Sequence, residues 1–487
     1  MTFIFVLVGW IFSLCLHEFA HAAVAFLGGD TSVREKGYLT FNPLRYVDPI
    51  ASLFVPLVFL LLGGIGLPGG GFAFGHGSTN GIGVPRVDVA GPEVPLPLNP
   101  ARAMIPVARI ADMLLNPGAS YAFNGRRYTF PDIRLVYWAG GNPFHHHQDL
   151  NRLQRAWQKP QTVIVHESWW TPTARHADIV LPATTTLERN DVGGSTRDTF
   201  ILAMHRAIDP VGDAKNDFDI FHALAQRLGY ERAFTEDRDE MAWCQWVYDQ
   251  VRASATAKGI AFPGFQQFWA EGFVELPPCE RDYVLFEDFR RDPERHPLKT
   301  PSGRIEIVSE AVAGFDYADC PPHPTWIPPA EWLGSAAAQR WPIHLVTHQP
   351  ASRLHAQMDP GPVSRRQKVA GREPVRINPQ DAARRGIRNG DIVRLFNPRG
   401  ACLAGAVLDA DVMPGVVVMA TGAWFDPADA AGEPERHGNP NVLTLDIGTS
   451  PLAQGTSALT ALVEIERWDQ PAPAVRAFTP PIVAAAG

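Results

Sequence analysis

Polar residues suited to holding a charged ligand follow three short apolar runs between Tyr137 and Asp191. The first run ends at Gly140-Gly141-Asn142-Pro143 and the second at His166-Glu167, while a short loop after the third leads to Glu188-Arg189. Glycine turns expose backbone N–H groups, and an arginine side chain pairs with phosphate oxygens. These residue types are typical of a site for a large, polar, phosphate-bearing cofactor.

The apolar runs predict three strands, and a helix is predicted between the first two. The strands are expected over Leu135–Ala139, Thr162–Val165 and Ala177–Leu181. The helix is expected over Gln148–Gln158, where Leu150, Leu153 and Trp157 recur at helical spacing. Strand, helix and strand in turn indicate a parallel sheet, and ligands of such sheets lie at the carboxyl ends of the strands.

The rest of the soluble part predicts further helices and then a mostly β region. A hairpin is expected over Tyr121–Phe130 around Asn124-Gly125, helices over Ile105–Leu115, Asp217–Leu228 and Met241–Ala253, and a short strand within Leu298–Ile307. Short strands are expected over Ile343–Thr347, Pro374–Ile377, Asp391–Phe396, Cys402–Leu408 and Val416–Ala420, with a helix over Pro379–Arg385. The predicted fold class is α/β, a parallel-sheet domain followed by a β-barrel domain and preceded by a pair of apolar helices.

Composition excludes several classes of protein. The 487 residues carry a net charge of −8 and no basic tail, so we expect no nucleic-acid partner. The five cysteines are scattered without a CxxC pair, which argues against a disulfide framework, a zinc ribbon and a cysteine-bound iron–sulfur cluster.

The first 67 residues differ from the rest of the chain. Thr2–Leu16 and Ile50–Leu67 are uncharged and apolar, and His17-Glu18-Phe19-Ala20-His21 follows the first run. HExxH on a helix places two imidazoles on one face, where they could bind zinc, and its glutamate could act as general base. An ionisable cluster among apolar residues indicates contact with a membrane. The first run has neither a basic start nor a twin arginine.

This segment resembles the start of the site-2-type intramembrane metalloprotease family, through HEFAHAAVAFLGGD and FNPLRYVDPIASLFVPLVFLLLGG. The resemblance implies zinc ligands at His17 and His21 and a base at Glu18. The family's third ligand, an aspartate in a later membrane helix, has no match here, and Asp48 does not fit that motif. The expected zinc site is therefore incomplete. A join within Ile65–Gly71 would mark a fusion, an assembly error or only a glycine-rich connector.

Five later motifs resemble the dimethyl sulfoxide reductase family of bis-molybdopterin enzymes, and within it the biotin sulfoxide and trimethylamine N-oxide reductases. They are GGNPFHHHQDLNRL, HESWWTPTARHADIVLPATTTLERND, LKTPSGRIEI, THQPASRLHAQ and GNPNVLTLDIGTS. The resemblance implies an α/β portion with a Pro-rich connection over 68–340 and a molybdopterin-dinucleotide-binding barrel over 341–487. It also implies molybdopterin guanine dinucleotide with molybdenum, oxygen-atom transfer from an S-oxide or N-oxide, and a cytoplasmic location, with membrane attachment through 1–67. The electron donor stays open.

The same resemblance implies cofactor contacts at individual positions. For one dinucleotide arm they are Asn142, His146, His166, Glu167, Arg189 and Asp217, with Asp219 competing for the role of Asp217. For the second arm and the pterin side they are Thr347, His348, Gln349, Pro350, Arg353, His355, Ala356, Asn441, Gln454 and Gly455. No residue of this chain matches the protein ligand of the molybdenum, so we expect the cofactor-binding half of a reductase without a complete active site.

Three interpretations therefore stay open: a molybdopterin oxidoreductase, a membrane metalloprotease fragment, or a nonfunctional fusion product. Other features have plainer explanations. Adjacent residues point in different directions, so His145-His146-His147 could hardly ligate one ion. We expect Arg365, Arg366 and Lys368 to form a solvated basic face and Trp169-Trp170 to pack in the core.

Overall fold

The computed structural model describes residues 105–194, 199–278, 284–430, 432–452, 454–455 and 460–481. The chain divides into two compact units. The first includes 276–305, and the second comprises 89–194, 200–275 and 306–487. The described helix of the first unit is α12 (Glu287–Arg291). All other described elements belong to the second unit, which carries the residues discussed below. The predicted boundaries 1–67, 68–340 and 341–487 stay predictions.

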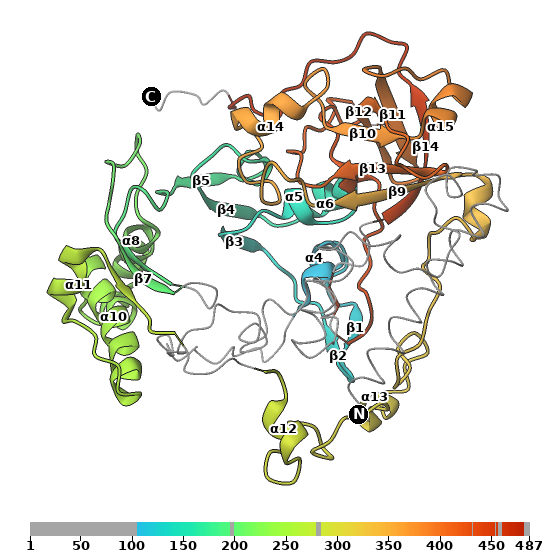
Figure 1. Ribbon diagram of the computed structural model, residues 1–487. Helices are drawn as coiled ribbons and strands as arrows, with labels where there is room; N and C mark the ends of the chain where they lie inside the picture. Colours follow the sequence, from blue (N-terminus) through green and yellow to red (C-terminus); the bar gives the residue numbers. More distant parts are fainter. Residues whose placement is uncertain are drawn as a thin grey trace, which may run out of the picture. The chain divides into compact units, whose positions relative to one another are not determined.

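A three-stranded parallel sheet holds the first group of predicted residues (Figure 1). Its order is β3-β4-β5, with Ala139 beside His166 and His166 beside Leu181 in register. The strands and the short helices between them are β3 (Leu135–Ala139), α5 (Pro143–His146), α6 (Leu150–Trp157), β4 (Thr162–Glu167), α7 (Pro172–Arg175) and β5 (Ile179–Pro182). The predicted strands, crossover helix and parallel arrangement are confirmed.

Helix α6 illustrates how local sequence sets an element. The Asp149 side chain accepts a hydrogen bond from the Arg152 amide at 3.0 Å and caps the helix start. Leu150, Leu153 and Trp157 lie on one face and are buried. Before the sheet come η4 (Val107–Arg109), α4 (Ile110–Leu115), β1 (Ser120–Phe123) and β2 (Arg126–Thr129). The last two strands form the predicted hairpin, with positive φ at both Asn124 and Gly125.

A helical portion with a small antiparallel sheet follows the parallel sheet. Asn216 caps α8 and Gly229, in the left-handed region, ends it, as the sequence predicts. The sheet order is β6-β7-β8, which the sequence did not predict. The bounds are β6 (Asp191–Gly193), β7 (Phe200–Met204), α8 (Asp217–Leu228), α9 (Glu231–Thr235), α10 (Glu240–Ala257), α11 (Phe265–Glu271) and β8 (Phe273–Glu275).

The predicted barrel is confirmed as a closed six-stranded barrel in the order β10-β12-β11-β14-β9-β13. Within it β9 and β13 run parallel, with His348 opposite Ala420 at their carboxyl ends. Its elements and those leading to it are α13 (Glu310–Ala313), η5 (Ala336–Gln339), β9 (Ile343–His348), α14 (Pro362–Gln367), β10 (Pro374–Ile377), α15 (Pro379–Arg384), β11 (Ile392–Asn397), β12 (Gly400–Leu408), β13 (Val416–Ala420), η6 (Pro440–Val442) and β14 (Thr460–Arg467).

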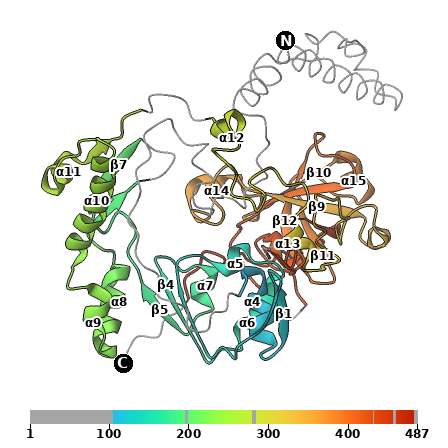
Figure 2. The ribbon, with the colours of Figure 1, turned by 90° about the horizontal axis from the view of Figure 1, so that it is seen from below.

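One hydrophobic core joins the parallel sheet to the barrel. It includes Leu153 of α6, Val163 of β4 and Leu395 of β11, all nearly inaccessible to solvent. In Figures 1 and 2, α5 and α6 lie beside the barrel, in agreement with this shared core. The two halves of the predicted cofactor site are therefore held by common packing.

Three sequence predictions do not hold or lie outside the described residues. No strand forms within Leu298–Ile307, which is turn and coil. Trp169 and Trp170 are exposed and not core residues. The apolar runs Thr2–Leu16 and Ile50–Leu67 lie outside the described residues, and no helix of the described residues has the length and apolar character needed to cross a membrane.

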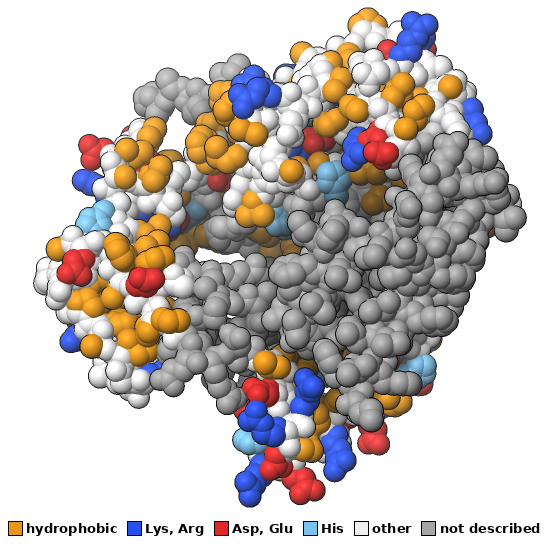
Figure 3. Space-filling model, viewed as in Figure 1, with side chains coloured by type: hydrophobic (Ala, Val, Ile, Leu, Met, Phe, Trp, Pro, Cys, Tyr) orange, Lys and Arg blue, Asp and Glu red, His pale blue; other side chains and the backbone are white. Residues whose placement is uncertain are grey.

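Some large apolar side chains stay at the surface. Figure 3 shows hydrophobic side chains gathered over the α10–α11 region, at the lower left. Nearby on the small antiparallel sheet, Leu202 and Phe273 are exposed. Single exposed apolar residues are normal, so these carry no functional conclusion on their own.

Candidate functional site

A glycine turn after β3 forms the centre of what we call the first cradle: Gly140, Gly141, Asn142, His146, His166, Glu167 and Asp217. Gly140 and Gly141 both have positive φ, and nothing lies within 4 Å of a Cβ added at Gly140. No hydrogen bond among the described residues uses the amide N–H of Gly141 or Asn142. The turn therefore offers backbone donors and open space beside the carboxyl end of β3.

The side chains of Asn142 and Glu167 connect the ends of β3 and β4. Asn142 Nδ2 donates to Glu167 Oε2 at 2.9 Å, and the Thr171 hydroxyl donates to the same oxygen at 3.0 Å. Thr173 also donates to Asn142 Oδ1. Burial raises the pKa of Glu167, while these hydrogen bonds oppose the rise. The predicted pair is thus brought together and rigidly oriented.

His166 connects β4 to the start of α8. Its Nδ1 lies 2.7 Å from Asp217 Oδ1, and its Nε2 lies 2.6 Å from the Tyr137 hydroxyl. Burial, and secondarily the charge of Asp217, raises the pKa of Tyr137, which keeps its proton. In the tautomer with its proton on Nδ1, His166 donates to Asp217 Oδ1 and accepts from the Tyr137 hydroxyl through Nε2. One oxygen of Asp217, Oδ2, stays available for a ligand donor.

Arg189 lies in the loop after β5. Its Nη1 donates to the Thr184 carbonyl at 3.3 Å, and its Nε lies 3.5 Å from Asp191 Oδ2. Both contacts are long, so the guanidinium can exchange them for an anionic ligand. Its neighbour Glu188 is buried and accepts from the amides of Thr185 and Val211, both at 2.6 Å, which fixes the loop that carries Arg189.

The second group of predicted residues follows β9. We call Thr347, His348, Gln349, Pro350, Arg353, His355 and Ala356 the second cradle. Gln349 Nε2 lies 3.0 Å from His355 Nδ1, and His355 has a positive φ. The Ala356 carbonyl accepts from Trp424 Nε1 at 2.9 Å. The loop is therefore anchored to the segment that follows β13, at the carboxyl ends of two parallel barrel strands.

The two cradles meet through α5 and the segments after β13. Phe144 stacks on Phe425 with ring centroids 5.9 Å apart, and His145 stacks on Trp424 at 5.7 Å. Buried Asn441 donates through Nδ2 to the His145 carbonyl at 3.2 Å. Burial, and secondarily the charges of His147 and His355, lowers the pKa of His146. Helix α5 thus contacts the segment after β13, which also anchors the second cradle.

Two buried polar atoms without partners lie next to cradle residues in the sequence. Among the described residues, His145 Nε2 and Ser352 Oγ are buried and make no hydrogen bond. A buried polar atom without a partner carries a free-energy cost, which a bound ligand could remove. The donor set fits a polar ligand that spans both cradles.

Gln454 and Gly455 lie apart from these contacts. Gln454 Oε1 accepts from Arg109 Nε at 2.6 Å, and its Nε2 donates to the Ala122 carbonyl. The Gly455 carbonyl accepts from the Thr449 amide at 3.0 Å. These hydrogen-bond partners of Gln454 belong to η4 and β1 and to neither cradle.

Sequence reasoning missed two supporting residues. Tyr137 fixes His166, yet in the sequence it is only one more apolar strand residue. Buried Glu435 accepts hydrogen bonds from four backbone amides, those of Asp426, His437, Gly438 and Asn439, at 2.7–3.1 Å. This contact orders the loop that leads to Asn441, and only a three-dimensional structure could show it.

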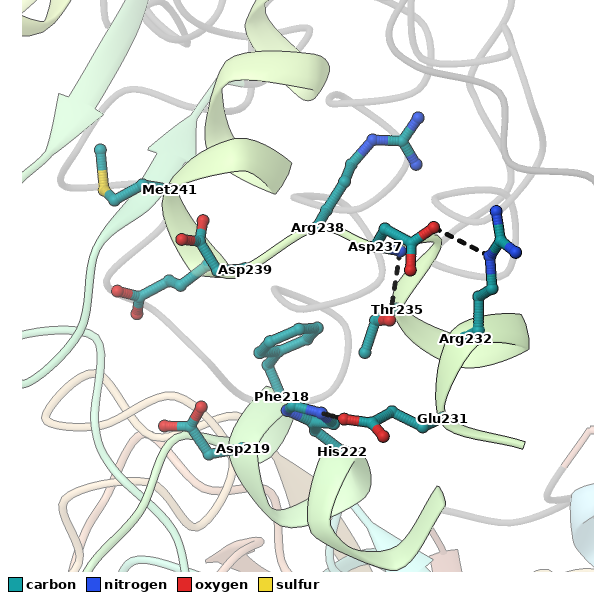
Figure 4. Close-up of a pocket in the computed structure, with 11 residues that line it drawn as sticks. Phe218, Asp219, His222, Glu231, Arg232, Thr235, Asp237, Arg238, Asp239 and Met241 are labelled. Atoms are coloured by element: carbon teal, nitrogen blue, oxygen red, sulfur yellow. Dashed lines mark hydrogen bonds and ion pairs between the residues drawn. The ribbon is translucent and has the colours of Figure 1, made fainter. Parts of the chain in front are cut away.

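An open cavity of about 700 Å³ lies away from the strand ends, between α8, α9 and the start of α10 (Figure 4). Asp219 lines it, and His222 within it lies 2.6 Å from Glu231. The cavity is therefore distinct from the cradles, and Asp219 faces it, whereas Asp217 faces His166.

The predicted zinc site is outside the described residues, which start after His17, Glu18 and His21. Within the described residues, no three His, Cys, Asp or Glu side chains are grouped to hold a metal ion. Lys368 differs from the expected solvated face: its side chain is 3% exposed and pairs with Asp359 and Glu373.

Comparison with protein families matches both halves of the site. Residues 55–227 match the Molybdopterin oxidoreductase family, and residues 343–462 match the Molydopterin dinucleotide binding domain. The first match contains the first cradle, and the second contains the second cradle and Asn441.

Curated relatives give the same result. The chain is 52% identical to a biotin sulfoxide reductase of Cereibacter sphaeroides, covering 83% of this chain and 54% of the relative. It is 48% identical to a dimethyl sulfoxide/trimethylamine N-oxide reductase of Cereibacter sphaeroides (84% and 51%), and 45% identical to a trimethylamine-N-oxide reductase of Haemophilus influenzae (86% and 53%). The chain spans about half the length of these relatives.

A solved structure shares the fold. Acetylene hydratase from Pelobacter acetylenicus aligns with a TM-score of 0.57 at 17% identity, over 75% of this chain and 47% of that one. At this identity the likeness concerns the fold alone.

Proposed function

We propose that the chain belongs to the molybdopterin oxidoreductase family and that its two cradles bind molybdopterin guanine dinucleotide in the service of S-oxide or N-oxide reduction. The relatives whose names state such substrates support the reaction class. When bound, the cofactor would supply a molybdenum centre for oxygen-atom transfer. The residues of this chain bind, orient and neutralise its dinucleotide arms.

The observation that carries the proposal is the meeting of the two cradles. Each lies at the carboxyl ends of parallel strands. His145, next to His146 of the first cradle, stacks on Trp424, and the Trp424 indole donates to the Ala356 carbonyl of the second cradle. A bis-molybdopterin cofactor has two dinucleotide arms that extend from one metal. Two adjacent polar cradles with unpartnered buried polar atoms next to them in the sequence fit such a ligand.

In the first cradle, the Gly140-Gly141 turn would donate N–H groups to phosphate oxygens, and Arg189 would pair with them. Asp217 would accept N–H donors of guanine through Oδ2, because His166 takes Oδ1. In the second cradle, the backbone and side chains of Thr347–Pro350 and His355–Ala356 would surround the other arm. Asn441 would contact the pterin side.

A protease function has no observation in its favour. His17, Glu18 and His21 lie outside the described residues, and the family matches begin at residue 55. The metalloprotease, the zinc and the fusion thus stay sequence-based predictions that the comparisons do not support. We also propose that the protein is cytoplasmic. We further propose that no residue in the part of the chain that matches the family is a ligand of the molybdenum.

Metal and nucleotide analysis of the purified full chain tests the proposal. Mass spectrometry of metals should find molybdenum, and acid release should give GMP at a ratio of about two per molybdenum. Turnover of biotin sulfoxide or trimethylamine N-oxide with a reduced viologen dye is a separate test, and such turnover would refute the expectation that this chain lacks a complete active site. Protein produced in a host that makes the cofactor, yet free of both molybdenum and GMP, would refute cofactor binding.

A further inference from the structure

Arg353 is buried among the protein's own acceptors. Its guanidinium is 2% exposed. Nε donates to the His355 carbonyl at 3.2 Å, Nη1 to Ser364 Oγ at 3.0 Å and Nη2 to the Thr421 carbonyl at 2.8 Å. An arginine whose three nitrogens are already engaged has little left to offer a phosphate.

Arg353 belongs to a closed ring of buried charges, which we call the charge ring: Arg353, Asp359, Lys368 and Glu373. Arg353 lies 3.5 Å from Asp359 Oδ1 and 3.2 Å from Glu373 Oε1. Lys368 Nζ closes the ring at 2.9 Å from Asp359 and 2.7 Å from Glu373. All four side chains are at most 3% exposed, so the removal of any one leaves an uncompensated net charge in the protein interior.

The charge ring is connected to the second cradle by direct contacts. Asp359 Oδ2 accepts from the Trp424 amide at 3.0 Å, and the Trp424 indole donates to the Ala356 carbonyl. Arg353 holds the carbonyl of His355, whose φ of +51° is an unfavourable conformation for a non-glycine residue. Gly422 lies so close to that carbonyl that a side chain there would overlap it. The ring therefore fixes His355 and Ala356 relative to the end of β13.

We propose that the charge ring is a positioning device, in which Arg353 acts as a positioning residue for the second cradle and does not itself contact the dinucleotide. This inference rests on the proposed function only where it names the ligand. Lys368, on the far side of Asp359 and Glu373 within the ring, then matters as much as Arg353. The proposed role of Arg353 differs from the expectation, drawn from the family resemblance, that Arg353 contacts the cofactor.

Hydrogen exchange of residues 348–357 in the full chain without cofactor tests the positioning, and bound GMP in the loaded chain tests its consequence. We expect Arg353→Met and Lys368→Met each to speed exchange there by about tenfold or more, because each leaves two buried carboxylates to share one cation. The double variant should be worse than either single variant, because it leaves both carboxylates without a cation. Each of the two single variants should also lower bound GMP. Arg366→Met, an exposed change in α14 two residues before Lys368, should alter neither exchange nor bound GMP.

A different result would overturn the inference. If Lys368→Met leaves exchange and GMP at wild-type levels while Arg353→Met loses GMP, Arg353 is a direct ligand. If Lys368→Met does not fold, the charge-balanced pair Lys368→Met with Glu373→Gln replaces it, and wild-type exchange in that pair counts against the ring. Failure of cofactor binding in the wild type would leave the exchange comparison intact, which separates this inference from the proposed function.

Discussion

At the scale of single residues, Asp217 and Asp219 can be told apart. Asp217 is fixed by His166, whereas Asp219 faces the cavity beside α9. We expect Asp217→Asn to lower the affinity for the guanine arm by about 10–100-fold, the worth of a hydrogen bond to a charged group. The effect is measured as the amount of cofactor-derived GMP that the purified chain keeps when free GMP is added as a competitor.

Two matched changes complete that test. Asp219→Asn and Asp213→Asn remove the same charge from α8 and from the exposed segment before it. Both should keep wild-type GMP content. An equal loss in Asp219→Asn would mean that the charge of the region, and not the contact at Asp217, favours the nucleotide.

Glu435 gives a pH-dependent contribution to stability. Burial raises its pKa to about 7 from an ordinary value of 4.5, against the four amide donors that favour the carboxylate. A folded-state pKa above the unfolded value favours folding most at low pH. This contribution is complete below about pH 4.5, falls as pH rises, and is lost above about pH 7.

The expected size is on the order of 1–3 kcal/mol, since the donors counteract part of the burial. Urea unfolding of wild type and Glu435→Gln between pH 4.5 and 8 measures it. The variant should show a smaller fall in the free energy of unfolding across this range. Parallel curves for the two proteins would show that Glu435 stays ionised throughout.

At the scale of elements, replacing a turn glycine by alanine should destabilise the fold by an amount that depends on the glycine's backbone conformation and surroundings. Gly140 has φ +78° with open space around it, whereas Gly422 has φ +86° and lies against the His355 carbonyl. Gly314 has φ −67°, which any residue adopts. Gly140→Ala should therefore lower the free energy of unfolding by about 1–2 kcal/mol. Gly422→Ala should lower it clearly more, and Gly314→Ala should leave it unchanged.

Thermal unfolding of the three variants gives the order directly. Gly422→Ala should also lose GMP, because it displaces the second cradle. An equal shift of the melting temperature in all three variants would contradict the argument, since it depends on backbone conformation and close approach.

Elements with strong local signals could be predicted from sequence. Strand β3 and helix α8 have the predicted bounds, because an apolar run ended by glycines defines the strand, and an asparagine cap and a terminal glycine define the helix. Strands β14 and β8 were missed, and each pairs with strands far away in the sequence. Strands β6 and β7 were also missed, although they are close in sequence. The expected strand in Leu298–Ile307 was wrong, since a turn signal does not guarantee a strand partner.

The site could be predicted in outline and not in its interactions. Strand ends and motifs placed Asn142, His166 and Glu167 together, as the structure confirms by their contacts. The burial of Lys368 could not be predicted, because a basic run in sequence does not show which carboxylates surround it. Tyr137 and Glu435 act through contacts that only the folded chain creates.

At the scale of the whole second unit, the parallel sheet and the barrel should unfold together. Phe144 is fully buried in the shared core, stacked on His176 at 4.3 Å and on Phe425 of the barrel side at 5.9 Å. Phe144→Ala should lower the free energy of unfolding by about 3–5 kcal/mol, as other large-to-small substitutions in a core do. Because one core serves both parts, hydrogen-exchange protection should fall equally in β4 and in β11. Phe273→Ala, at a side chain 51% exposed, should change neither strand by comparison. Loss of protection in β4 with β11 unchanged would show two independent folding units, and the cradles would then need the cofactor itself to hold them together.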